Sequence, residues 1–232
     1  MDIAGRIVNE WALSCRFTLI LPASPKIEAK VKLPKSKKPP LYVAIHEAGH
    51  AVIMMFLGLP RRIKYVSLTD TPPGTVGFVK ASARFDRQLA DAVRATEQFS
   101  RGDDAAVSVV AFQKRAAWWE VVDLIAGNVA ELRSRQINSL TRAMVISQTI
   151  EAAGQRRDGS EFPDDFVQIY ERLEWLDKDA IGSNALKALE ETEALVTAHW
   201  SKIRELGRLL HKTMHIDEDA LIHWRERWQS DF

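Results

Sequence analysis

Two histidines and a glutamate lie close together in the segment "LYVAIHEAGHAVIMMFLGLP". These residue types at this spacing make the segment the first candidate for a metal site in the chain. In an α-helix, residues four apart share a face, so His46 and His50 can direct ring nitrogens at one point. Neutral imidazoles suit Zn²⁺, which prefers tetrahedral coordination. Glu47 projects near that point, where it can take a proton from a zinc-activated water and deliver it to a leaving amine. Gly49, which lacks a side chain, allows another backbone or a substrate to come close.

The helix that must position these residues is expected to be buried. Residues 42–57 contain no proline and are apolar nearly all round, whereas Pro39 and Pro40 precede them and Gly58 and Pro60 follow. A helix that is apolar on all sides lies in a core, where unpaired histidine and glutamate side chains cost free energy. Hydrogen-bonded core histidines without a metal are the alternative, and the predicted burial favours the metal site over it.

Composition predicts a soluble protein of a reducing compartment, and we expect a cytoplasmic location. The 232 residues are 46% hydrophobic and 27% charged, and 32 basic side chains nearly cancel 31 acidic ones. This balance does not call for nucleic acid or an anionic membrane as partner. Cys15 is the only cysteine, which excludes an intramolecular disulfide. No apolar run reaches the roughly 20 residues that span a bilayer.

The pattern along the chain predicts a mainly α fold with one small antiparallel β-sheet. Residues 1–40 are expected to be an N-terminal extension with a lysine- and proline-rich linker, and residues 41–232 the folded domain. Two strands are predicted on either side of the turn "DTPPG". The predicted strands cover 63–68 and 75–80, and the helices that follow cover 84–99, 103–117, 118–135, 138–153, 164–178, 184–211 and 217–228.

The segment "AIHEAGHAVIMMFLG" resembles the zinc-site helix of the FtsH-type metallopeptidases, the protease half of the membrane-bound AAA proteases. Further segments similar to that family follow in the same order, over residues 41–81 and 118–225. They are "RIKYVSL…GTVGFVK", "VVDLIAGNVAELR", "GSEFPDDFVQIYERL" and "LVTAHWSKIRELGRLLHKTMHIDEDAL". The resemblance implies a helical bundle like the FtsH peptidase domain, with a Zn²⁺ cofactor. It also implies that substrate binds along the edge strand that contains Val76, Gly77, Phe78 and Val79.

The resemblance implies a third zinc ligand, an aspartate at the start of a helix. Asp164 and Asp165 compete for this role. In the family, apolar residues follow the aspartate at offsets of one, four and eight, and counting from Asp165 gives Phe166, Ile169 and Leu173. We therefore expect Asp165 to be the ligand, with helix capping as the alternative role for this residue.

Other acidic and histidine residues are weaker ligand candidates. Glu131 could be the ligand, since a downstream glutamate has this role in some enzymes with the same motif. It could instead pair with Arg135 one turn later, or hold a zinc histidine from behind. His211 and His215 also have helical spacing, but without a glutamate between them, and contacts at the end of a helix explain them more simply.

The chain also departs from the family. No ATPase domain and no transmembrane segment are expected, residues 83–117 look like a helical insertion, and Asn128 stands where an arginine is usual. These departures leave three hypotheses open. The first is an ATP-independent zinc metalloendopeptidase acting on peptides or unfolded proteins. The second is a catalytically silent, protease-derived zinc-binding regulatory or interaction module. The third is a helical interaction protein with structural histidines. A homo-oligomer is a possible assembly.

Overall fold

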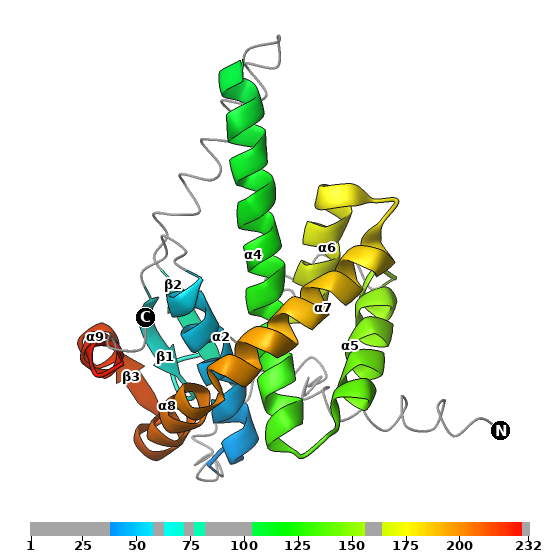
Figure 1. The fold of residues 1–232 in the computed structure, drawn as a ribbon. Helices are drawn as coiled ribbons and strands as arrows, with labels where there is room; N and C mark the ends of the chain where they lie inside the picture. Colours follow the sequence, from blue (N-terminus) through cyan, green and yellow to red (C-terminus); the bar gives the residue numbers. More distant parts are fainter. Residues whose placement is uncertain (1–37, 58–62, 72–76, 82–103, 156–163, 229–232) are drawn as a thin grey trace, which may run out of the picture.

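The computed structural model describes residues 38–57, 63–71, 77–81, 104–155 and 164–228 (Figure 1). These residues form a mainly helical fold with a small antiparallel sheet, as predicted. Most of the predicted N-terminal extension, and the part of the predicted insertion from 83 to 103, lie outside the described residues. In chain order the elements are α2 (Leu41–Phe56), β1 (Ile63–Ser67), β2 (Phe78–Ala81), α4 (Asp104–Ser134), α5 (Ser139–Ala153), α6 (Asp165–Asp177), α7 (Ile181–Ala198), α8 (Trp200–Thr213), β3 (His215–Asp217) and α9 (Glu218–Glu226).

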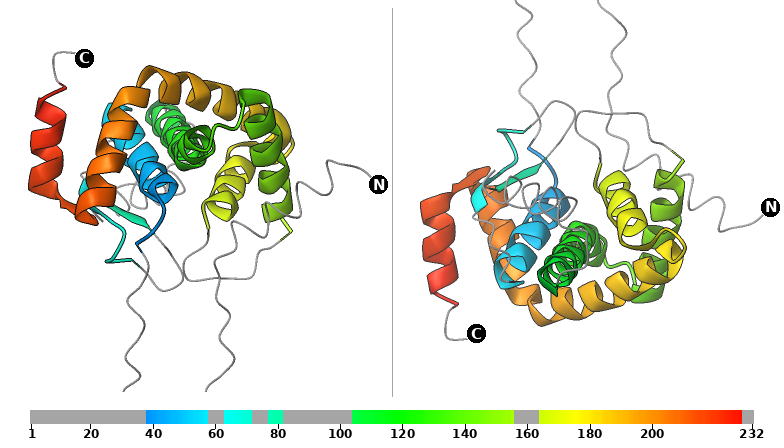
Figure 2. Two further views of the ribbon diagram at one scale, coloured as in Figure 1. Left: turned by 90° about the horizontal axis from the view of Figure 1, so that it is seen from below. Right: turned by 90° about the horizontal axis from the view of Figure 1, so that it is seen from above.

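Helix α2 occupies the centre of the fold and is buried, as its apolar sequence predicts. It packs between α4 on one side and α8 on the other, and Figure 2 shows α6 on the far side of α4. Small residues allow the two central helices to approach closely. A Cβ atom on Gly49 would lie 2.8 Å from the carbonyl oxygen of Ala126. The sequence predicts that a backbone or a substrate comes close to Gly49, and the structure places the backbone of α4 there.

The sheet has three strands in the order β2–β1–β3, both pairs being antiparallel. The pairing of Val66 with both Val79 and Ile216 places an apolar residue from each strand side by side. Strand β3 was not predicted from the sequence. It exists because Met214 adopts a left-handed conformation (φ 67°) that ends α8 and turns the chain back along β1.

Two helix boundaries differ from the sequence prediction. Helix α4 is continuous where two helices, 103–117 and 118–135, were expected, and no proline or glycine interrupts it before Gly127. The predicted helix 184–211 is instead broken at His199, whose backbone leaves the helical region (φ −105°, ψ 15°). The break lets α7 pack on α4 while α8 packs on α2.

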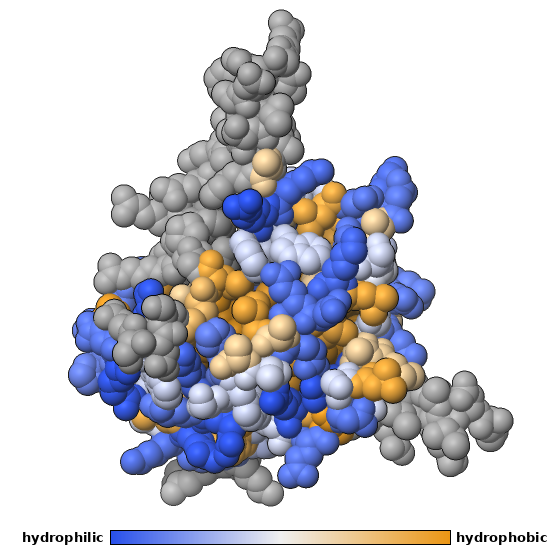
Figure 3. All heavy atoms as spheres, in the orientation of Figure 1, coloured by the Kyte–Doolittle hydropathy of each residue, from blue (hydrophilic) through white to orange (hydrophobic). Residues whose placement is uncertain are grey.

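Most large apolar side chains of the described residues are buried. Those that are exposed are spread over α2, α5, α6, α7 and α9, and Figure 3 shows apolar and polar residues intermixed on one face. They are Leu41, Leu140, Met144, Trp175, Leu186 and Ile222. Within the described ranges, no helix combines the length and the apolar character needed to cross a membrane.

Candidate metal centre

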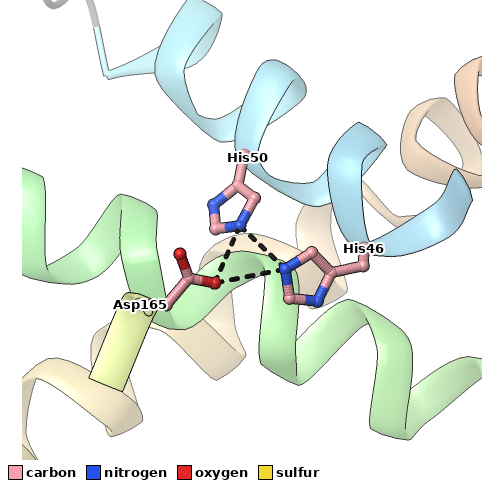
Figure 4. A group of neighbouring side chains, drawn as sticks. All are labelled: His46, His50 and Asp165. Atoms are coloured by element: carbon pink, nitrogen blue, oxygen red, sulfur yellow. Dashed lines mark hydrogen bonds and ion pairs between the residues drawn. The ribbon is translucent and has the colours of Figure 1, made fainter. Parts of the chain in front are cut away.

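The structure brings His46, His50 and Asp165 together, although Asp165 is more than a hundred positions from either histidine (Figure 4). The Nε2 atoms of the two histidines are 3.1 Å apart. Oδ2 of Asp165 lies 3.2 Å from Nε2 of His46 and 3.4 Å from Nε2 of His50. Three potential ligand atoms therefore form a nearly equilateral triangle.

The size of this triangle fits a zinc ion. Tetrahedral bonds of about 2.0–2.1 Å place neighbouring ligand atoms about 3.3–3.4 Å apart. The three observed separations, 3.1, 3.2 and 3.4 Å, come close to that spacing. A point about 2 Å from all three atoms therefore exists beside the triangle, and a tetrahedral ion at that point would have one further coordination direction.

Helix α6 directs Asp165 toward α2 because Asp164 takes the capping role. The side chain of Asp164 accepts a hydrogen bond from the backbone N–H of Val167 at 2.9 Å, which makes Asp164 the N-cap. Ile169 and Leu173 are fully buried, and burial of such a side chain contributes about 1.5–3 kcal/mol. Their packing fixes the rotation of α6, so Asp165 faces the histidines.

The far nitrogens of both histidines face acceptors on α4. Nδ1 of His50 is 2.8 Å from the backbone carbonyl oxygen of Asp123, which can only accept, so Nδ1 carries the hydrogen. Nδ1 of His46 lies 3.3 Å from Oε2 of Glu131. In neutral rings, both Nε2 lone pairs then point toward the carboxylate of Asp165. Such a set of acceptors requires a cation at its centre, either protons or a metal ion.

The pKa values show the same attraction for positive charge. Burial lowers the pKa of His50, but the negative charge of Asp165 outweighs it and raises the value to about 9. Burial likewise lowers the pKa of His46, and contacts with Asp165 and Glu131 raise it well above its ordinary value. Burial raises the pKa of Asp165, but the charge of His50 and contacts with both histidines hold it far below the usual range. Without a metal, the carboxylate of Asp165 therefore favours protonation of the imidazoles.

Glu47 is buried beside the triangle, and burial raises its pKa even though the charges of His46 and His50 lower it. Gly77, directly before β2, lies against it. A Cβ atom on Gly77 would lie only 2.4 Å from Oε1 of Glu47. The start of the predicted substrate strand is therefore next to the candidate general base.

The remaining predicted site residues lie in different places. Glu131 is behind His46 rather than on the ligand side, and it also pairs with Arg135 at 3.2 Å. Phe78 and Val79 lie in β2, whereas Val76 is outside the described residues.

His211 and His215 lie apart from the candidate metal centre. His211 contacts the carbonyl oxygen of Pro39. The ring of His215, in β3, lies beside Tyr65 with ring centroids 5.2 Å apart. Among the described residues, neither His211 nor His215 belongs to a group of side chains that could hold a metal ion.

The sequence prediction missed part of the contribution of α4. Asp123, Gly127 and Glu131 are spaced four apart, so they form one stripe along the helix. A Cβ atom on Gly127 would lie 2.3 Å from Nε2 of His50, so only glycine leaves room for the imidazole. The spacing is visible in the sequence, but its meaning depends on knowing that α2 packs against this stripe.

Comparison with known proteins adds no family assignment: no protein-family model matches the chain, and no curated protein matches it.

Proposed function

We propose that the protein is a zinc-dependent endopeptidase whose metal is held by His46, His50 and Asp165. The observation that carries the proposal is the triangle of ligand atoms, 3.1–3.4 Å on each side, beside a buried glutamate. The resemblance to FtsH-type peptidases supports the reaction class, and a helical fold with a small sheet is compatible with it. Peptides or unfolded proteins would be the substrates.

A bound Zn²⁺ ion would polarise the peptide carbonyl and lower the pKa of water in the site. Glu47 would accept the proton of the attacking water and pass it to the leaving amine. Its raised pKa suits this second step, because a carboxyl group that binds its proton more tightly is populated as an acid nearer neutral pH. Glu131 and the carbonyl of Asp123 would hold the two imidazoles in the tautomer that presents Nε2.

The edge of β2 would bind the substrate as an added strand. In the described part of the sheet, β2 pairs with β1 on one side only. An extended peptide can hydrogen-bond to such an edge. Because Gly77 lies against Glu47, a peptide paired with the start of β2 would pass close to the carboxylate.

The proposal is tested by metal analysis and by cleavage of denatured casein. The purified wild-type protein should hold about one zinc per chain and cleave the substrate. Glu47→Gln should keep the metal and lose cleavage, whereas Asp165→Asn should lose both. His223→Gln, at a histidine whose side chain is 82% exposed, is the matched surface control. Cleavage by Glu47→Gln at the wild-type rate would remove Glu47 from the mechanism. Zinc without any cleavage would favour the catalytically silent module.

A further inference from the structure

Asn128 reaches the candidate metal centre from α4. Its side-chain amide nitrogen lies 3.1 Å from the backbone carbonyl oxygen of Leu124 and 3.5 Å from Oδ2 of Asp165. Both neighbours are acceptors, so the NH₂ end of the amide, with its two hydrogens, must face them. One N–H therefore holds the side chain to its own helix, and the other points at the carboxylate.

The contact with Asp165 differs in kind from those that the histidines make. Oδ2 of Asp165 also lies within 3.4 Å of both histidine Nε2 atoms, which donate to it only when they are protonated. Rings that use Nε2 to bind a metal have no hydrogen on that atom, and they then give the carboxylate no hydrogen bond. The N–H of Asn128 does not depend on protonation, so it persists in the metal-bound state.

The donor is also neutral. An amide can orient a carboxylate without cancelling its negative charge, whereas a cationic donor would weaken its attraction for a metal ion. Asn128 lies on α4, the helix that contacts both histidines from behind. Its contact with Asp165 reaches α6, the helix that carries the aspartate. Asn128 thus connects the helix behind the histidines to the third ligand.

We infer that Asn128 is a positioning residue that orients the carboxylate of Asp165 toward the metal held by His46 and His50. The inference rests on the proposed metal site and names the residue that sets its geometry. If the role of Asn128 were only to bond the carbonyl of Leu124 within α4, its loss would change the stability of the helix and leave the metal site as it is.

The test is titration of the metal-free full chain with Co²⁺, whose visible spectrum reports the coordination geometry. Wild type should show the intense bands of a tetrahedral complex. Asn128→Leu keeps nearly the same size and zero charge but removes the donor. It should bind Co²⁺ about 10–100-fold more weakly, with a shifted or weaker visible spectrum. Asn128→Ala should show a loss in the same range, and Asn128→Gln, which keeps an amide, should recover part of the affinity. Asn184→Leu on α7 makes the same substitution away from the site and should leave the titration unchanged.

The outcomes separate this inference from the proposed metal site. Wild-type affinity and spectrum in both Asn128→Leu and Asn128→Ala would overturn the positioning role. Equal Co²⁺ binding by wild type and His50→Ala would instead overturn the metal site, and the inference with it. Circular dichroism of each metal-free variant shows whether it is folded. The Leu, Ala and Gln variants provide independent tests if one of them is not.

Discussion

The substitution Gly127→Ala tests how closely α4 must approach the candidate metal centre. The added Cβ atom would lie 2.3 Å from Nε2, 2.7 Å from Cε1 and 2.8 Å from Cδ2 of His50. The ring cannot easily turn away, because His50 is buried and its Nδ1 is held by the carbonyl of Asp123 at 2.8 Å. The methyl group must therefore displace the imidazole or push α4 away from α2.

The two effects of the substitution oppose each other in the metal-free protein. Alanine in place of glycine inside a helix normally stabilises it by about 1 kcal/mol. Overpacking of a buried site costs about 1–3 kcal/mol. The net change in the free energy of unfolding is then a loss of about 0–2 kcal/mol, and the variant should still fold. Metal sites tolerate shifts in ligand distance of only about 0.2 Å. Displacement of Nε2 should therefore lower zinc affinity by roughly 10–100-fold.

Zinc affinity is measured by competition with a chromophoric chelator, and stability by thermal melting of the metal-free protein. Gly182→Ala, near the start of α7, is the matched control because, apart from its chain neighbours and the backbone of its own helix, no atom lies within 4 Å of the added Cβ. It should raise the melting temperature slightly and leave zinc affinity unchanged. If Gly127→Ala binds zinc as tightly as wild type, Nε2 of His50 is not a ligand or α4 does not approach it as described.

Three further predictions concern the same site. The pKa of His50 is raised from 6.5 to about 9. Its contribution to the stability of the metal-free protein is therefore complete below pH 6.5 and is lost as the pH rises through about 9. Chemical denaturation across this range should show the loss of stability, and the loss should be smaller in His50→Gln. Asp164→Ala removes the N-cap of α6 and should cost about 1 kcal/mol of stability with little change in zinc affinity. Asp165→Asn should instead abolish zinc binding. The reverse result would assign the ligand to Asp164. Gly77→Ala places a Cβ atom 2.4 Å from Oε1 of Glu47. It should lower kcat for casein cleavage while zinc content stays at the wild-type level. An unchanged kcat would show that Gly77 does not set the position of the general base.

The sequence predicts the parts of the site that depend on local periodicity. His46 and His50 share a face because they are one helical turn apart, and burial of α2 follows from its apolar residues. The position of Asp165 could be predicted only through the family resemblance. No local rule relates it to α2, although the apolar positions of Ile169 and Leu173 do indicate which way α6 faces.

The features that the sequence prediction missed depend on tertiary contacts. Strand β3 has only three residues, and its pairing with β1 gives it strand structure. No glycine or proline marks the break at His199. The helix breaks there because α7 packs on α4 whereas α8 packs on α2. The support that Asp123 gives His50 comes from a backbone carbonyl, which no side-chain pattern can indicate. Gly127 by itself predicts only a weak point in a helix.

These missed features explain how two distant segments can form one precise site. Helix α4 packs against both α2 and α6. It supports the histidines through Asp123 and Glu131, leaves space for a ring at Gly127, and reaches Asp165 through Asn128. The raised pKa values of the histidines indicate that protonated imidazole attracts Asp165 when no metal is bound. A metal ion would therefore replace protons in an arrangement that is largely formed. The free energy of metal binding would be spent on displacing those protons rather than on folding the site, so zinc affinity should fall as the pH decreases while the helical content stays constant.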